Sequence, residues 1–224
     1  MTFGVSPRPR DLPLIRQLKP HTNFKLFTDR QGRTLTRDEH YALELQFHDG
    51  GRIEVSVNPQ FERLTRPFSL PNGVTIPAGD YDFGEFRLQY SSDRSRLLAG
   101  TLNLERGGYY DGRRTRLSAG ATVLLRPRLS TAVNYEYNQV RVDAGGYRAD
   151  LFSLRSTYSF SPAAFADAYV QHNSSTKTTL TNLRLNYTYH PLSSLIVVYD
   201  ETRGPSRATS WRALVFKVTR LVQF

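Results

Sequence analysis

Charged side chains at alternate positions are the residues of this sequence with the widest scope for chemistry. Alternate positions of a β-strand lie on one face of a sheet, so charges spaced in this way gather on a common surface. Such a surface can line a polar channel or a solute site and set its selectivity. It can equally form a lattice of salt bridges and hydrogen bonds that fills a narrow interior. The residues expected on it, as a lumen lining, are Glu44, Glu54, Glu85, Arg87, Glu105, Arg116, Glu136, Arg155, Asp167, Arg184 and Lys217.

His172 and Ser174, in the sequence HNS, have a spacing that a base and a nucleophile could use on one strand face. A nucleophile needs a base within hydrogen-bond reach and a further group that orients the base. This pair falls in a predicted loop, QHNSSTKTT, that is rich in Ser and Thr. The sequence also has no glycine-rich phosphate loop and no serine in a nucleophile elbow. We therefore assign no catalytic residue.

The other histidines do not form a metal-binding pattern. His21, His40, His48 and His190 include no pair at i, i+2 or i, i+4 spacing. The chain has no cysteine, which excludes disulfide bonds and thiolate metal sites. We expect neither a metal site nor a cofactor.

The elements that position these residues are predicted to be long β-strands with one apolar and one polar face. In TNLRLNYTYH, residues 181–190, leucine and tyrosine alternate with polar and charged residues. Composition agrees, because 13 Tyr, 13 Phe, 15 Gly and 12 Pro favour strands separated by turns. The same alternation appears in segments 41–48, 52–58, 85–90, 116–125, 133–138, 152–158 and 212–224.

The predicted connections alternate between short and long. HDGG, SSDRSR, RPRLS, FSPAA and HPLSS are short, whereas ERGGYYDGRR, HNSSTKTT and RGPSRATS are long. This pattern is typical of an up-and-down outer-membrane barrel, and it gives about 12 strands, several of them long enough to cross a bilayer. The connection from Asn58 to Asp80 is predicted to be irregular and stiffened by proline. It either folds into the mouth of the barrel as a constriction or caps the barrel outside.

Alternation alone does not distinguish a membrane barrel from a soluble one, because a soluble barrel is apolar inside and polar outside. Three features favour the membrane. Aromatic residues recur near strand ends, as in interfacial belts, the polar faces carry both signs of charge, and the long connections fall at one end. Two alternatives stay open: an outer-membrane hydrolase with its site at the extracellular rim, and a soluble β-barrel that binds an apolar ligand.

The charge of the chain is strongly basic, with 30 Lys and Arg against 20 Asp and Glu and a formal net charge of +10. Such a balance can indicate a nucleic-acid partner. Here the arginines are scattered singly on strands and at turns, with no basic helix or long run. We expect no nucleic-acid partner. No apolar run approaches the roughly 18 residues of a membrane helix, and the N-terminus lacks the apolar core of a signal peptide.

The last segment, RALVFKVTRLVQF, places alternating apolar residues before a terminal phenylalanine. It resembles the C-terminal signal by which the bacterial outer-membrane barrel assembly machinery recognises its substrates. The residues that carry this resemblance are Leu214, Phe216, Val218, Val222 and Phe224. Arg220 departs from the pattern, and we expect it at the membrane interface, where its charge can reach water.

Longer stretches, LRLNYTYHPLSSLIVVYDETRG and GRIEVSVNPQFERLTRPFSL, resemble an uncharacterised family of Gram-negative outer-membrane proteins. Members of that family carry a signal peptide and an N-terminal family-nine carbohydrate-binding-type domain before a β-barrel of unknown function. The resemblance implies a barrel, an outer-membrane location and carbohydrate as a partner of the N-terminal domain. Since neither the signal peptide nor that domain is recognised here, we expect a C-terminal portion of a longer protein.

The sequence therefore predicts an all-β, up-and-down antiparallel transmembrane β-barrel of about 12 strands. Residues 1–20 are expected to form an irregular N-terminal segment, and residues 21–224 the barrel domain. The expected role is that of a membrane anchor or a porin-like pore of a larger protein, linked to carbohydrate binding or uptake through the resemblance alone. The expected partners are outer-membrane lipid and the assembly machinery.

Overall fold

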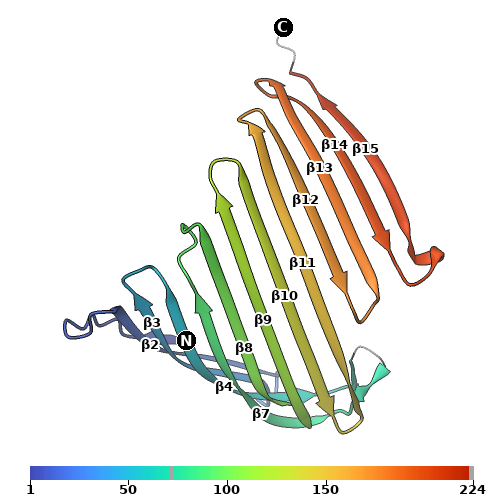
Figure 1. Cartoon of the computed structure of the whole chain (residues 1–224). Coiled ribbons are helices and arrows are strands. Elements are labelled where there is room, and N and C mark those ends of the chain that lie inside the picture. The colour runs from blue at the N-terminus through green and yellow to red at the C-terminus, as the bar shows by residue number, and fades with distance from the viewer. Residues whose placement is uncertain (71–72, 222–224) are drawn as a thin grey trace. The chain divides into compact units, whose positions relative to one another are not determined.

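The computed structural model describes residues 1–70 and 73–221, and its regular structure is almost entirely β-sheet. The main sheet is 13-stranded and antiparallel, and it follows chain order once β5 and β6 are set aside (Figure 1). This confirms the predicted all-β class and up-and-down order. The strands of the main sheet are β1 (Thr2–Gly4), β2 (Ile15–Thr28), β3 (Thr34–Phe47), β4 (Arg52–Leu64), β7 (Gly79–Ser91), β8 (Leu98–Tyr109), β9 (Gly112–Leu125), β10 (Leu129–Val142), β11 (Gly145–Ser161), β12 (Ala164–Asn173), β13 (Thr178–His190), β14 (Ser193–Arg203) and β15 (Trp211–Thr219).

Setting aside the three-residue β1, the 13-stranded sheet has 12 long strands, from 9 residues in β15 to 17 in β11. The short 3-10 helix η2 (Arg207–Thr209) precedes β15. The described residues contain no helix that is both long enough and apolar enough to span a membrane.

The strand register aligns the apolar residues of neighbouring strands into rows. Leu43 lies opposite Val55, Val55 opposite Leu88, and Leu88 opposite Leu104. One residue along, Ser56 lies opposite Arg87, and Arg87 opposite Glu105. Because side chains alternate with a period of two, this register places the apolar row and the polar row on opposite faces of the sheet. We call these the apolar face and the polar face.

The segment from Asn58 to Asp80, predicted to be one irregular connection, is shorter and more ordered than expected. Strand β4 continues to Leu64 and β7 begins at Gly79, which leaves residues 65–78 between them. Within this connection β5 (Phe68–Ser69) and β6 (Thr75–Ile76) pair as a small antiparallel hairpin. Proline was a misleading signal here, because Pro59 lies inside β4 and Pro77 directly follows β6.

The segment ERGGYYDGRR, predicted to be a long loop, is a tight turn between two strands. Strand β8 runs to Tyr109 and β9 begins at Gly112, so only Tyr110 and Asp111 connect them. The glycines belong to a strand because neighbouring backbone approaches closely. A Cβ atom on Gly107 would lie 2.2 Å from the carbonyl oxygen of Gly84, a position that only glycine can occupy.

The N-terminal segment 1–20, predicted to be irregular, contains β1 and the beginning of β2. Thr2, Phe3 and Gly4 pair with Asn23, Thr22 and His21. The terminal amine of Met1 also donates to the carbonyl oxygen of Phe24 at 2.8 Å. The irregular part is therefore residues 5–14, where prolines lack the backbone donor that a ladder requires.

Contacts divide the chain into two compact units. Unit 1 comprises Met1–Asp93, Gly100–Ala119 and Tyr137–Arg148, and unit 2 comprises Arg94–Ala99, Gly120–Glu136 and Ala149–Phe224. The edge strands of the sheet are β1 and β15, and no ladder joins them within the described ranges. Each unit is described below on its own.

Candidate functional site

Burial along the strands of unit 1 is reversed relative to a water-soluble sheet. Ser56 has 2 % of its surface exposed, whereas its neighbours Val55 and Val57 are 39 % and 50 % exposed. Glu85 and Glu105 are also buried, on the same polar face. Charged side chains are almost never fully buried unless they are paired. The candidate functional site is therefore the polar face, where the buried charges lie.

Two buried carboxylates and three arginines form a carboxylate–arginine lattice on this face: Glu85, Arg87, Glu105, Arg114 and Arg116. Arg87 lies between the carboxylates, with Nη2 at 3.2 Å from Glu85 Oε1 and Nε at 3.3 Å from Glu105 Oε1. Arg114 Nη2 donates to Glu85 Oε2 at 3.0 Å, and Arg116 Nη1 donates to Glu105 Oε2 at 3.1 Å. Each carboxylate thus contacts two guanidinium groups. Three of the four contacts are charge-assisted hydrogen bonds, and the contact of Arg87 Nε with Glu105 is an ion pair alone.

The lattice brings together four of the residues predicted from sequence, Glu85, Arg87, Glu105 and Arg116. Arg114 completes it and was not predicted, although it alternates with Arg116 on the same strand and could have been found from that spacing. Of the two alternatives predicted from sequence, a selective channel lining and a salt-bridge lattice, the paired geometry corresponds to the lattice. Glu44 also has a partner, because Lys19 Nζ lies 3.5 Å from Glu44 Oε1. Glu54 lies directly opposite Glu44 in the register.

Two histidines that are far apart in the sequence meet on the polar face. The Nε2 atoms of His21 and His40 are 3.3 Å apart, and His40 Nδ1 lies 2.5 Å from the side-chain oxygen of Asn58. Spacing along the chain did not indicate this pair, because it arises from the pairing of β2 with β3. The described residues hold no group of three or more His, Cys, Asp or Glu side chains that could bind a metal ion.

The β5–β6 hairpin packs onto the polar face of unit 1 through a small apolar core, which we call the hairpin core. It consists of the buried residues Leu70, Ile76, Val140 and Val142, with partly buried tyrosines around them. One of these, Tyr109, adjoins the lattice, since the guanidinium carbon of Arg114 lies 4.8 Å from the centroid of its ring. The hairpin therefore covers the part of the polar face that lies next to the lattice.

Tyr110, in the turn that joins β8 to β9, links the hairpin core to β4. Its hydroxyl donates to Glu62 Oε2 at 2.9 Å, and its ring packs against Tyr81 and Phe68. Burial raises the pKa of the Tyr110 phenol, and the hydrogen bond to the Glu62 carboxylate raises this pKa further. The protonated phenol is thus the form that the fold stabilises.

A third buried carboxylate, Asp167, lies on the polar face of unit 2. Arg155 Nη2 and Nε contact the two oxygens of Asp167 at 2.9 and 3.2 Å, and the Thr157 hydroxyl donates to it at 2.6 Å. Arg184 lies directly opposite Asp167 on β13. Three of the predicted residues, Arg155, Asp167 and Arg184, are therefore brought together here.

The remaining predicted residues have no ion pair within the described ranges. Glu136 and Lys217 are exposed, on β10 and β15. Of the predicted assembly signal, Leu214, Phe216 and Val218 lie exposed on β15, while Val222 and Phe224 lie outside the described residues. Strand β15 ends at Thr219, so Arg220 follows the strand directly.

His172 and Ser174 do not form a hydrogen bond with each other, and each has a different partner. His172 lies in β12, where sequence predicted a loop, and its Nδ1 is 2.9 Å from the Thr179 hydroxyl. Ser174 follows the strand, and its hydroxyl accepts a hydrogen bond from the backbone N–H of Asp150 at 2.8 Å. The Ser174 hydroxyl itself donates to the Asp150 carboxylate at 3.5 Å, so its partner is Asp150 and not His172.

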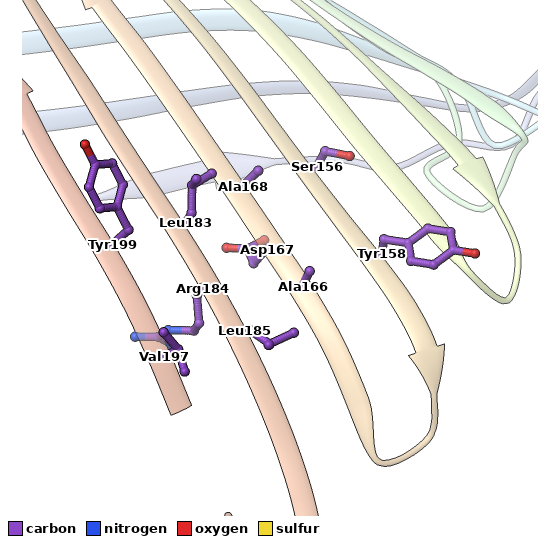
Figure 2. A pocket seen from close by; sticks show the side chains of 10 residues that line it. All are labelled: Ser156, Tyr158, Ala166, Asp167, Ala168, Leu183, Arg184, Leu185, Val197 and Tyr199. Atoms are coloured by element: carbon purple, nitrogen blue, oxygen red, sulfur yellow. The ribbon is translucent and has the colours of Figure 1, made fainter. Parts of the chain in front are cut away.

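The apolar face of unit 2 carries a shallow depression of about 400 Å³ (Figure 2). Ala166 and Ala168 on β12 line it with small side chains. Larger apolar side chains border it, namely Tyr158, Leu183, Leu185, Val197 and Tyr199. The Asp167 carboxylate is bound by Arg155 and Thr157, so the depression itself is apolar in character.

Comparison of the chain with models of known protein families and with curated proteins finds no match. The family resemblance drawn from sequence therefore stays a prediction.

Proposed function

We propose that this chain is a transmembrane antiparallel β-barrel of the bacterial outer membrane and serves as the membrane anchor of a larger protein. The observation that carries this proposal is the reversed burial along β4, where Ser56 is buried between the exposed valines Val55 and Val57. In water, a sheet gains free energy by burying valine and exposing charge. In a membrane barrel the apolar face contacts lipid and the polar face lines the interior.

Strand length supports the same proposal. Strands β4 and β7 have 13 residues each, which at about 3.3 Å per residue span roughly 43 Å. A strand tilted by about 45° needs 9–11 residues to cross the hydrocarbon core of a bilayer. These strands therefore have the length to cross the core and reach both interfaces. The soluble alternative requires the opposite arrangement, with leucine and phenylalanine buried and Glu105 exposed.

An anchor with a restricted interior fits the polar face better than an open pore does. The carboxylate–arginine lattice occupies the polar face with paired charges, and the β5–β6 hairpin covers the part beside it. Both features fill space that an open channel would leave to water. The packing of the hairpin onto the polar face supports, of the two placements predicted for the Asn58–Asp80 connection, a constriction at the mouth of the proposed barrel. The link to carbohydrate rests on the sequence resemblance alone and concerns the N-terminal domain of such proteins.

The experiment is expression in a Gram-negative host with a signal peptide, followed by membrane fractionation and gel electrophoresis with and without heating. We expect recovery in the outer-membrane fraction and a heat-dependent change in migration, because a folded barrel resists the detergent until it is heated. A protein that is monomeric and soluble without detergent contradicts the proposal. Single-channel recording then separates anchor from pore: we expect low conductance that rises when residues 66–77 are replaced by a short glycine–serine link.

A further inference from the structure

Three arginines on the apolar face of unit 1 line one depression of about 400 Å³. They are Arg106 on β8, Arg113 on β9 and Arg141 on β10. The remaining lining residues are Gly107, Gly108, Thr115 and Gln139, so no acidic side chain contributes to the depression. We call it the arginine pocket.

The register places all three arginines on the face that carries the apolar side chains. Arg106 lies directly opposite Phe86, which is exposed on that face. Arg113 adjoins Arg114, which bonds to Glu85 on the polar face, so the two side chains point to opposite faces. Arg141 lies between Val140 and Val142, both buried in the hairpin core on the polar face. The arginine pocket is therefore a cationic depression on the face that carries Leu43, Val55 and Phe86.

The three arginines lie close to the strand ends. Strand β8 ends at Tyr109, β9 begins at Gly112, and β10 ends at Val142. These ends lie on the same side of the meander as the 65–78 connection, the longest one in unit 1. In the proposed barrel, this is the level of the lipid headgroups, where interfacial side chains meet both acyl chains and polar groups.

The arginines of the pocket differ from other arginines of unit 1 in their charge pairing. On the same face, Arg37 pairs with Asp82 and Arg63 with Asp80. Arg87, Arg114 and Arg116 each contact a glutamate on the polar face. Within the described ranges, Arg106, Arg113 and Arg141 have neither an ion pair nor a side-chain hydrogen bond. Guanidinium groups gathered in one depression repel one another unless an anion lies between them, and their planar donors match phosphate oxygens in geometry.

We propose that Arg106, Arg113 and Arg141 bind the phosphate group of a membrane glycolipid at the rim of the apolar face. This site rests on the proposed function, because the lipid must contact the apolar face for its phosphate to reach the arginines. The apolar side chains beside the pocket, such as Phe86, would contact the acyl chains of the same molecule. Free phosphate offers the same charge without those apolar contacts.

The test uses the full chain folded in detergent and a double variant, R106Q/R141Q, with R126Q/R128Q as the matched control. Arg126 and Arg128 lie in the connection between β9 and β10, and neither lines the arginine pocket. Each protein is mixed with bis-phosphorylated lipid A, with the same glycolipid after removal of its phosphates, and with inorganic phosphate. Bound ligand is measured by native mass spectrometry and by the shift in unfolding temperature.

We expect the wild type and the control to retain the phosphorylated glycolipid, and the R106Q/R141Q variant to bind it at least about tenfold more weakly. Equal binding by this variant overturns the site. Binding of inorganic phosphate as tight as that of the glycolipid overturns the assignment to a lipid. Heat-dependent migration of the same samples reports the barrel independently, so a folded membrane protein with unchanged lipid binding refutes only the arginine pocket.

Discussion

Val57 is exposed at the middle of β4. The cost of a charged residue at this position depends on whether lipid or water surrounds it. If lipid covers the apolar face, an arginine at this position must be desolvated or must distort the bilayer. We predict that V57R lowers the free energy of unfolding in lipid vesicles by about 2–4 kcal/mol. Denaturant titration of the vesicle-bound protein measures this, with V57L as the control. An unchanged midpoint for V57R would mean that Val57 faces water.

Glu105 contacts two arginines while it is itself buried, so its charge is needed to balance theirs. We predict that E105Q lowers the free energy of unfolding by about 1.5–3 kcal/mol, because Arg87 and Arg116 lose a charged acceptor. The matched control is E136Q, a glutamate that is exposed and has no ion pair in the described residues. We expect E136Q to change stability by less than about 0.5 kcal/mol. Equal effects of the two variants would show that the carboxylate–arginine lattice does not stabilise the fold.

Tyr110 gives the fold a dependence on alkaline pH. Its pKa is raised above the ordinary value of 10.0 by burial and by the hydrogen bond to Glu62. The stabilisation that it contributes is thus complete below pH 10 and is lost as the pH rises through the raised pKa. We predict that Y110F costs about 1.5 kcal/mol at pH 8 and that this difference shrinks above pH 10. Unfolding titrations of both proteins from pH 8 to 11 test this, and a difference that grows with pH would contradict it.

At the scale of elements, the hairpin formed by β5 and β6 depends on one buried side chain. Ile76 has no exposed surface, and it packs with Leu70, Val140 and Val142. We predict that I76A loosens the hairpin by about 2–4 kcal/mol and accelerates chymotrypsin cleavage after Phe68, an exposed residue of β5, at least about tenfold. The control is T75A, which alters the exposed neighbouring residue. Unchanged cleavage in I76A would show that the hairpin is not held by this core.

The strands were predictable from sequence because their period-two alternation is set by local chemistry. TNLRLNYTYH and RIEVSVN fall within β13 and β4, with the predicted parity of faces. The β8–β9 turn was not predictable in the same way. Gly107 and Gly108 look like loop residues, but glycine is required there because the Gly84 backbone approaches Gly107 closely. Only the paired strands reveal that constraint.

The polar face was predictable in part, since parity alone places Glu85, Glu105 and Arg116 on one side of the sheet. The partners of each charge were not predictable, because they depend on register between strands that sequence does not specify. The His21–His40 contact and the arginine pocket were not predictable for the same reason, because both depend on strand register. Alternation along each strand could have placed Arg106, Arg113 and Arg141 on the apolar face, near the strand ends. It could not have shown that the three arginines lie together.

At the scale of the whole molecule, the two units have the same division of faces. Among the residues that the structure describes, the buried charges are Glu85 and Glu105 in unit 1 and Asp167 in unit 2. Each has arginine partners on its own face, while leucine, valine and aromatic side chains are exposed on the other. In the proposed barrel, lipid contacts the apolar face of both units. A barrel in the membrane also requires that the edges at β1 and β15 be closed by further strand pairing.

The most direct test of this account is the accessibility of spin labels along β13 in lipid vesicles. The chain has no cysteine, so L183C, R184C and L185C each give a single labelled site on alternate faces. We predict that labels at 183 and 185 collide with dissolved oxygen and are shielded from a water-soluble nickel chelate, and that the label at 184 does not show this preference. Labels at 183 and 185 that are more accessible to the nickel chelate than to oxygen would contradict the proposed membrane barrel.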